Sequence, residues 1–244
     1  MCGNSNQTEL IALHKKLSES LNCTIGISET EMLLKHLRFV LKVNQTINLT
    51  SITDENSGRM LHIEDSLTAL PEVASALPGK LVDMGSGGGF PGMPLAIVSR
   101  REVTLVESAK KKAAVLERFI KENDMGALVE VKAIRIEELA ILQRGVFAVA
   151  TARALTSLSG IMELAAPLLI TGGLLIAYKG KLSEREILGA RNAEELLGME
   201  MKNRREIVLS DGETKRELLI FKKVEEAKIK LPRKSGKAQK HPLC

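Results

Sequence analysis

One glycine-rich segment constrains the fold of this chain more than any other. The segment Asp83-Met-Gly-Ser-Gly-Gly-Gly-Phe-Pro-Gly92 begins within a short apolar run, Leu81–Met84. Glycine tolerates positive φ and lets a ligand approach the backbone closely. In open α/β sheets, ligands bind just beyond the carboxyl ends of the strands, where such turns lie. The segment therefore predicts a buried strand, a ligand-binding turn and then a helix.

Short apolar runs alternate with helical patterns along the rest of the chain. We expect further strands and helices, in chain order, at residues 103–106, 109–121, 129–132, 146–150, 174–178 and 183–197. Two last apolar runs flank an Asp-Gly pair, which is typical of a tight hairpin. This alternation predicts an α/β fold with a doubly wound, mostly parallel, Rossmann-like sheet and an antiparallel C-terminal edge.

The first 70 residues have a different character from the rest of the chain. Their apolar residues recur at helical spacing, and Ser28-Glu-Thr-Glu31 matches a capping box that would open a helix. We therefore predict three parts. Residues 1–70 form an N-terminal helical extension packed on the core, residues 71–227 form the ligand-binding core, and residues 228–244 form a basic tail.

The tail carries the excess of positive charge. The chain has 35 Lys and Arg against 30 Asp and Glu, and six of the cations fall in residues 228–244, which hold no acid. Such a run can displace counterions from a phosphate backbone and bind nucleic acid without reading its sequence. A solvated chain end is the alternative interpretation. Aromatic residues are scarce, with five Phe, one Tyr and no Trp, so base stacking is not the expected binding mode.

Several features predict a cytoplasmic protein without a membrane span or a metal site. The best candidate for a membrane span, the uncharged segment Leu164 to Tyr178, is shorter than the roughly 20 residues that a span needs, and the N-terminus lacks the layout of a signal peptide. The three cysteines, Cys2, Cys23 and Cys244, are far apart and form no zinc pattern and no disulfide framework.

The glycine turn is compatible with two cofactors. Gly87-x-Gly89-x-x-Gly92 matches the dinucleotide fingerprint, whereas Gly85-x-Gly87-x-Gly89 after an acid resembles the S-adenosylmethionine (SAM) pocket of class I methyltransferases. Asp83 favours SAM, because a carboxylate there would attract the cationic methionine end and repel a pyrophosphate. Glu107 ends the next strand and could accept both ribose hydroxyls of either cofactor.

An ordered set of motifs resembles the RsmG (GidB) family of bacterial methyltransferases. The motifs run from about Asn44 to Leu243 and include Asn48-Leu-Thr-Ser-Ile52, His62-Ile-Glu-Asp-Ser-Leu67, Gly89-Phe-Pro-Gly92, Arg135-Ile-Glu-Glu138, Thr151-Ala-Arg-Ala154, Tyr178-Lys-Gly180 and Pro232-Arg-Lys-Ser-Gly236. The resemblance implies a class I fold and SAM as the cofactor. It also implies methyl transfer to N7 of the guanine numbered 527 in 16S ribosomal RNA, free or within the small subunit.

The same resemblance, joined to the position of each residue, gives the expected site. The cofactor-binding residues are expected to be Asp83, Gly85, Gly87, Phe90, Glu107, Ile136, Glu137 and Arg153, where the Arg153 cation could hold the SAM carboxylate or an RNA phosphate. The RNA-binding residues are expected to be Lys179, Arg233, Lys234, Lys237 and Lys240. We expect the protein to act as a monomer.

No catalytic side chain is expected, because guanine N7 has a free lone pair and needs no general base. Catalysis should then rest on positioning and on control of charge. His62 and Asp65 share a helix face, but contact with RNA or a structural role is the preferred interpretation of His62. Two other functions stay open at this point: an NAD(P)-dependent oxidoreductase and a non-catalytic rRNA-binding assembly factor.

Overall fold

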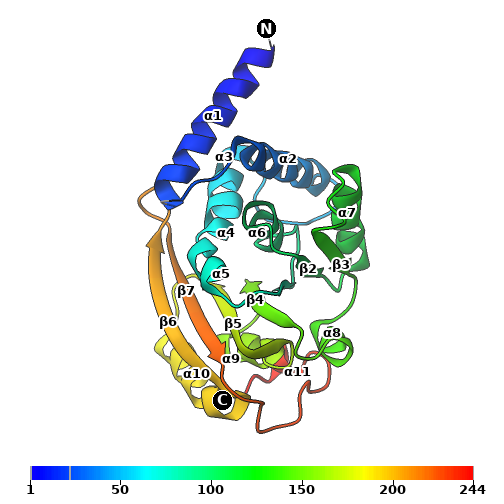
Figure 1. The fold of residues 1–244 in the computed structure, drawn as a ribbon, viewed down its shortest axis with the longest axis vertical. Coiled ribbons are helices and arrows are strands. Elements are labelled where there is room, and N and C mark those ends of the chain that lie inside the picture. The colour runs from blue at the N-terminus through cyan, green and yellow to red at the C-terminus, as the bar shows by residue number, and fades with distance from the viewer. Residues whose placement is uncertain (1, 22, 244) are drawn as a thin grey trace.

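The seven strands found in the described residues form one sheet in the order β3-β2-β1-β4-β5-β7-β6 (Figure 1). The structure is a computed structural model that describes residues 2–21 and 23–243. Met1, Asn22 and Cys244, which belong to the predicted N-terminal extension and tail, lie outside these residues. The strands are β1 (Lys80–Met84), β2 (Val103–Val106), β3 (Val129–Lys132), β4 (Phe147–Arg153), β5 (Leu169–Lys179), β6 (Met199–Val208) and β7 (Lys215–Lys223).

The sheet confirms the predicted fold class. β1 pairs in parallel with both β2 and β4, and β5 pairs in parallel with β4. β7 is antiparallel to β5 and to β6, and these pairings make the predicted antiparallel edge. Strand order reverses at β1, between β2 and β4, so a ligand crevice is expected at the carboxyl ends of these strands.

Several strands are longer than the sequence predicts, and two of them, β4 and β5, border the ligand crevice. β4 continues to Arg153, and β5 starts at Leu169 rather than at Leu174. Gly172, with a φ of +88°, lies inside β5, and the register between β4 and β5 shifts beside it. Pairing with β4 keeps the chain extended on both sides of this irregularity. As a result, Arg153 is the last residue of its strand and lies at the rim of the sheet.

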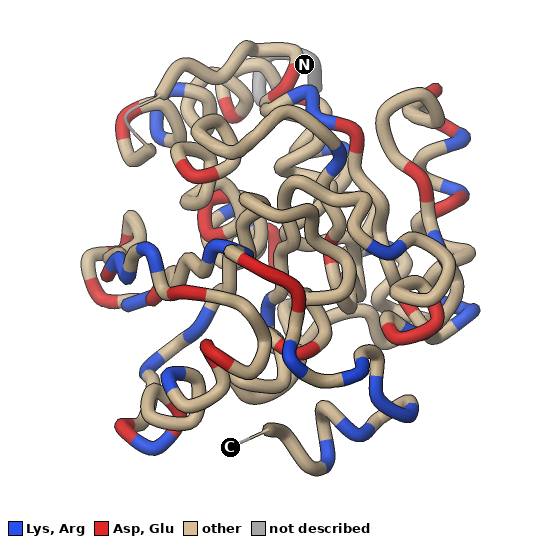
Figure 2. The backbone as a smooth tube through the Cα atoms, turned by 60° about the horizontal axis from the view of Figure 1, so that its bottom comes forward, with Lys and Arg blue, Asp and Glu red and all other residues tan. Residues whose placement is uncertain are grey.

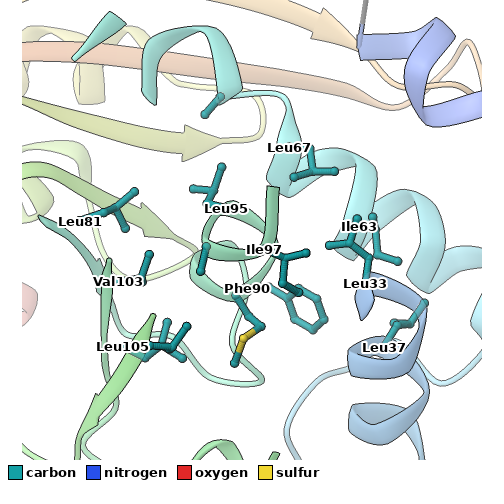
Figure 3. Packing of buried hydrophobic residues seen from close by; sticks show 14 of the residues in the cluster. Leu33, Leu37, Ile63, Leu67, Leu81, Phe90, Leu95, Ile97, Val103 and Leu105 are labelled. Atoms are coloured by element: carbon teal, nitrogen blue, oxygen red, sulfur yellow. The ribbon is translucent and has the colours of Figure 1, made fainter. Parts of the chain in front are cut away.

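Helices cover both faces of the sheet, as Figure 1 shows. Alternate residues of a strand pack against the helices on opposite faces of the sheet. In β1, Leu81 belongs to one apolar cluster, and Val82 and Met84 belong to the other. The first cluster is shown in Figure 3, where Leu33 and Leu37 lie beside Ile63 and Phe90. Its helical elements are α1 (Cys2–Leu21), α2 (Ile27–Asn44), the π-helical turn η1 (Arg59–Glu64), α4 (Asp65–Leu67), α5 (Leu70–Ser75), α6 (Gly92–Ser99) and α7 (Lys110–Glu122).

The second layer contains α8 (Ile136–Leu142), α9 (Leu158–Ala165), α10 (Glu184–Leu197) and α11 (Lys237–Lys240). α11 comes from the predicted tail, and its Ala238 is buried with Leu231 in this cluster. Figure 2 shows the tail as a run of Lys and Arg positions on the backbone near the C-terminus. The tail is thus folded against the core over much of its length. Its independence as a domain, like the boundaries at residues 70 and 227, stays a prediction.

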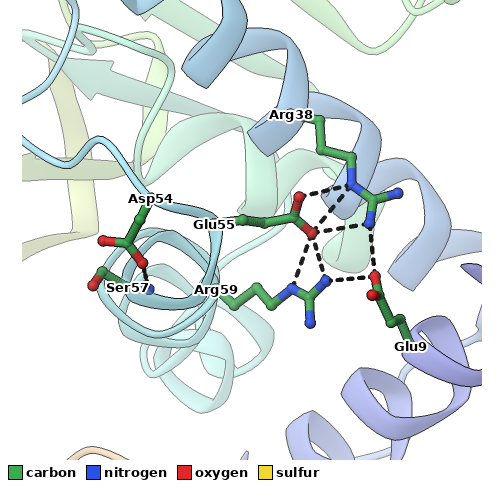
Figure 4. Close-up of polar contacts among 6 residues, drawn as sticks. All are labelled: Glu9, Arg38, Asp54, Glu55, Ser57 and Arg59. Atoms are coloured by element: carbon green, nitrogen blue, oxygen red, sulfur yellow. Dashed lines mark hydrogen bonds and ion pairs between the residues drawn. The ribbon is translucent and has the colours of Figure 1, made fainter.

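The N-terminal helices are joined to one another by an ion-pair network (Figure 4). Glu55, at the start of the short helix α3 (Glu55–Gly58), accepts hydrogen bonds from Arg38 of α2 and from Arg59. Glu9 of α1 lies 3.0 Å from the guanidinium nitrogens of both arginines. Exposed pairs contribute little individually, but a shared network fixes the geometry of its members. Beyond this contact, the N-terminal part of α1 projects from the body (Figure 1).

The predicted capping box is wrong. α2 begins at Ile27, one residue before the predicted cap, and its N-cap residue is Gly26. The Ser28 hydroxyl therefore lies within the first turn, where it donates to the Glu29 carboxylate instead of covering a backbone amide. The Thr30 hydroxyl donates to the carbonyl of Gly26, which ties the start of the helix to the preceding loop.

The core contains one fully buried histidine whose protonation would destabilise the fold. His36 packs against Phe90 and Phe119, with ring centroids 4.7 and 4.9 Å away, and neither ring nitrogen meets a hydrogen-bond partner among the described residues. Burial lowers the pKa of His36 from 6.5 to about 3, although the nearby Gly88 backbone opposes this shift. Between these pKa values the unfolded chain binds more protons than the folded chain, so stability falls as the pH decreases.

We predict that the variant His36→Leu loses less stability in acid than the wild type. Between pH 6.5 and 5 the difference in the free energy of unfolding should reach about 2 kcal/mol, since one pKa unit corresponds to about 1.4 kcal/mol. Urea unfolding across this range measures it. His241→Leu, at an exposed histidine, is the control and should keep the wild-type slope. Equal slopes for His36→Leu and the wild type would contradict the prediction.

Candidate functional site

Two cavities meet at the carboxyl ends of the central strands. The larger has a volume of about 790 Å³ and lies between the glycine turn, η1 and the ends of β4 and β5. The smaller has a volume of about 160 Å³ and lies between the ends of β2 and β3, the start of α8 and the tail. Gly85 lines both cavities. An elongated ligand that occupies both would therefore pass across this one glycine.

Hydrogen bonds to the Asp83 carboxylate hold the glycine turn in place. One carboxylate oxygen accepts a hydrogen bond from the Thr151 hydroxyl of β4 at 2.9 Å, and the other accepts from the Gly92 amide of α6 at 3.0 Å. Asp83 is buried and lines neither cavity. Burial raises its pKa to about 6, while the two hydrogen bonds act in the opposite direction. The geometry supports a positioning role for Asp83, and its predicted direct contact with a cofactor stays a prediction.

The turn itself needs glycine at the junction of the cavities. Gly85 and Gly87 have φ values of +76° and +55°, in the left-handed region that residues with a Cβ avoid. The amides of Gly85 and Ser86 both donate to the carbonyl of Val106 at the end of β2. A Cβ on Gly85 would come within 2.7 Å of the Leu155 side chain. The conformation at this position therefore disfavours a side chain, and a Cβ would also have to displace the end of the Leu155 side chain.

The smaller cavity gathers four of the predicted cofactor residues, one of which is Gly85. Glu107, at the end of β2, accepts hydrogen bonds from the amides of Gly87 at 3.0 Å and Ala109 at 2.7 Å. A carboxylate has about four acceptor positions, so the half-buried Glu107 keeps capacity for ribose hydroxyls. Ile136 and Glu137, at the start of α8, line the same cavity. This combination of a carboxylate, an apolar wall and a glycine junction fits an adenosine group.

Phe90 and His62 form an aromatic wall of the larger cavity. Their rings are stacked, with centroids 4.3 Å apart and an angle of 6° between the planes. The Nε2 atom of His62 lies 2.8 Å from the Thr50 hydroxyl. Burial, and then the positive charge of Arg153, lower the pKa of His62 to about 3. The imidazole is therefore neutral at physiological pH.

Arg153 reaches the larger cavity as part of a buried ion pair. Its guanidinium donates to Asp65 at 2.9 Å and to the carbonyl of Leu61 at 2.9 Å. The same Asp65 oxygen lies 3.4 Å from Arg216 of β7, and its other oxygen has no hydrogen-bond partner among the described residues. Arg153 does not line the smaller cavity. The structure thus places it with His62 and Phe90, away from Glu107 and Ile136.

The predicted RNA-binding residues fall into two groups. Lys179 and Arg233 are engaged within the protein, with Lys179 2.6 Å from Glu186 and Arg233 bound through two nitrogens to the buried Glu163. Lys234, Lys237 and Lys240 are exposed, and in the described part of the chain they form no ion pair. These three lysines are the cations of this set that are available to a partner.

Some residues that line the two cavities were not predicted from the sequence, because no local pattern marks them. Thr50 sits in the loop that follows α2, and Asn44 holds that loop by accepting from the amides of Leu49 and Thr50. Gln239 reaches the smaller cavity from the tail, which the sequence assigns to RNA alone. Only the order of family motifs could have pointed to Thr50. Among residues 2–21 and 23–243, no group of three or more His, Cys, Asp or Glu is placed to hold a metal ion, and no helix has the length and apolar character for a membrane crossing.

Comparison with known sequences gives one family along most of the chain. A family model described as "rRNA small subunit methyltransferase G" (GidB) matches residues 29–218. Curated relatives with the name "Ribosomal RNA small subunit methyltransferase G" match almost end to end. The protein of Alkaliphilus oremlandii is 31% identical over 96% of this chain and 99% of its own. The protein of Pseudothermotoga lettingae is 37% identical over 90% of this chain and 94% of its own.

Solved structures share the fold at low sequence identity. The geranyl diphosphate C-methyltransferase of Streptomyces coelicolor superimposes with a TM-score of 0.52 at 14% identity and covers 65% of this chain and 78% of its own. The [4+2]-cyclase SpnF superimposes with a TM-score of 0.53 at 13% identity. The match covers 66% of this chain and 81% of the SpnF chain. These likenesses establish the class I α/β architecture. A cyclase and a methyltransferase share it, so the fold leaves the reaction open.

We predict that Gly85→Ala weakens the binding of SAM, the cofactor that the sequence predicts. The new Cβ would press on Leu155 at the junction of the cavities, and the positive φ should cost about 1–2 kcal/mol of stability. Calorimetric titration with SAM and urea unfolding measure the two effects. Gly126→Ala is the control, because a Cβ there meets nothing within 4 Å. Wild-type SAM affinity in Gly85→Ala would contradict the assigned position of the cofactor.

Proposed function

Because the chain belongs to the rRNA small subunit methyltransferase G (GidB) family, its activity is the SAM-dependent methylation of small-subunit rRNA, and we propose that its acceptor is N7 of the guanine numbered 527 in 16S rRNA. One observation carries this proposal most directly: the cavity suited to adenosine shares the lining residue Gly85 with a second, larger cavity. Two adjoining cavities are what a transfer between a cofactor and a flipped base requires.

We propose that SAM lies across the two cavities and supplies the methyl group. Glu107 would accept the ribose hydroxyls, and Ile136 and Glu137 would flank the adenine in the smaller cavity. The methionine end would then pass Gly85 and enter the larger cavity, where Arg153 is the candidate partner of its carboxylate. Asp83 would act indirectly, since it holds the glycine turn that both halves of the cofactor contact.

We place the target guanine in the larger cavity, beside the stacked pair of His62 and Phe90. The reaction adds positive charge to the guanine ring, so an unpaired cation beside N7 would slow it. Two features limit the positive charge beside the stacked rings, while Arg216 and the exposed Lys181 also line this cavity. The low pKa of His62 keeps its imidazole neutral, and the Asp65 carboxylate compensates the charge of Arg153. Since N7 carries no proton, these residues need only position the base and balance charge.

The exposed lysines of the tail are our candidates for contact with RNA phosphates. Lys234, Lys237 and Lys240 follow one another on the surface of a segment that also borders the smaller cavity. Lys179 and Arg233 are paired within the protein, so RNA contact by either would compete with Glu186 or Glu163. We further propose that the protein acts in the cytoplasm, where small-subunit rRNA is found, and that it acts as a monomer.

The alternative functions have weaker support. An NAD(P)-dependent oxidoreductase would use the amides near Gly92 for a pyrophosphate, but the Gly92 amide is already bound to the buried Asp83. A non-catalytic assembly factor would need the tail but no paired cavities. Both alternatives also conflict with the family of this chain.

We predict that the purified protein transfers label from radiolabelled SAM to unmethylated small-subunit particles or their RNA. Nuclease digestion and mass spectrometry should locate the label on N7 of one guanine, the one numbered 527. Particles that already carry this methyl group are the control and should accept no label. Label on another nucleotide or another atom would contradict the proposed acceptor, and a lack of transfer to both RNA and particles would contradict the activity.

We predict that the triple variant Lys234→Gln, Lys237→Gln and Lys240→Gln binds RNA with a weaker dependence on salt. The slope of log K against log salt is negative, and each lost phosphate contact makes it less steep by about 0.7–0.9. The slope of the triple variant should therefore be less negative by about 2. Filter binding between 50 and 200 mM salt measures it. Lys15→Gln, Lys16→Gln and Lys35→Gln remove the same charge from exposed positions on α1 and α2. A slope change that is equal in both triple variants would contradict a specific role for the tail.

A further inference from the structure

The C-terminal tail forms part of the smaller cavity. Gln239 of α11 lines this cavity together with Glu107, Ile136 and Glu137. Three residues earlier, the Gly236 amide donates a hydrogen bond of 2.6 Å to the Glu137 carboxylate. The segment that the sequence assigns to RNA thus also reaches the place assigned to adenosine. A feature that serves RNA binding alone would not need these inward contacts.

Strong local contacts hold the segment in this position. Arg233 donates through two nitrogens to Glu163 of α9, which is only 3% exposed, and through one of them also to the carbonyl of His241. Paired contacts of this kind between Arg and a carboxylate fix orientation as well as adding energy. Ala238 is buried, and its carbonyl lies so close to Gly160 of α9 that a Cβ there would come within 2.6 Å. The position of α11, and with it of Gln239, is therefore well defined.

We propose that Gln239 is a cofactor-binding residue whose side-chain amide hydrogen-bonds the edge of the adenine ring. This inference rests on the proposed binding of SAM in the smaller cavity and extends it to the tail. A carboxamide offers a donor and an acceptor side by side, and the amino group and ring nitrogens of adenine offer the complementary pair. Segment 232–241 is then the outer wall of the adenosine site, with Gln239 facing the cavity and Lys237 and Lys240 exposed.

The test compares two ligands that differ only at the adenine edge. S-adenosylhomocysteine has the amino group that Gln239 would recognise, and S-inosylhomocysteine has an oxygen in its place. Calorimetric titration of the full chain with both ligands gives the ratio of their affinities without any methyl transfer. We expect the wild type to prefer the adenosyl ligand. We expect Gln239→Ala to bind that ligand roughly 3- to 10-fold more weakly and to lose most of the preference, as for one net hydrogen bond.

A neighbouring variant controls for general effects of changing α11. Lys240→Ala alters an exposed side chain that lines neither cavity, so it should keep both the affinity and the preference of the wild type. Gln239 is itself exposed at the surface, and circular dichroism and thermal unfolding should show an intact fold for both variants. A loss of folding alone would weaken the binding of both ligands equally and leave their ratio unchanged.

The outcomes separate the inference from the proposed function. If the wild type binds S-adenosylhomocysteine and Gln239→Ala keeps the same affinity and the same ratio, the role of Gln239 is wrong and the cofactor assignment stands. If the wild type binds neither ligand, the cofactor assignment fails and the inference fails with it. A wild type that binds both ligands equally would also overturn the inference, because no group would then recognise the adenine edge.

Discussion

The buried carboxylate of Asp83 ties together the three segments that shape the site. It belongs to β1, accepts a hydrogen bond from Thr151 on β4 and accepts another from Gly92 at the start of α6. A Cβ on Gly92 would come within 2.7 Å of the Cβ of Asp83, so this contact needs a glycine. The Gly-rich pattern is therefore explained in part by packing on Asp83 rather than by phosphate binding. Once this contact is made, the turn at Gly85 is placed where two cavities meet.

Charges that line the larger cavity are also held by contacts within the protein. Asp65 lies against Arg153 and Arg216, and the neighbouring histidine is held neutral by burial. Buried charges are tolerated when they are paired and hydrogen-bonded. The pairing of Arg153 and Arg216 with Asp65 reduces the positive charge beside the stacked rings, which suits a reaction that leaves a positive charge on a purine ring. The exposed lysines of the tail, Lys234, Lys237 and Lys240, line neither cavity and can meet phosphates without facing the base.

The sequence predicts most of the fold because the apolar periodicity of its strands and helices is strong. The strand from Val103 to Val106 and the hairpin at Asp211-Gly212 follow from local patterns and agree with the structure. The family motifs also bring together residues that share a cavity, such as Glu107, Ile136 and Glu137. What local patterns miss are contacts between distant residues. The pairs Arg233 with Glu163 and Arg153 with Asp65 join positions 70 and 88 residues apart, and no spacing rule indicates them.

The most direct test of this account is a crystal structure of the protein soaked with S-adenosylhomocysteine. We predict that the adenosine group lies in the smaller cavity, with the ribose hydroxyls on Glu107 and the sulfur atom beside Gly85, next to the larger cavity. An adenosine group in the larger cavity, among His62, Phe90 and Arg153, would contradict it. The paired cavities would then not divide the cofactor from the base in the way that the charges and the glycine junction indicate.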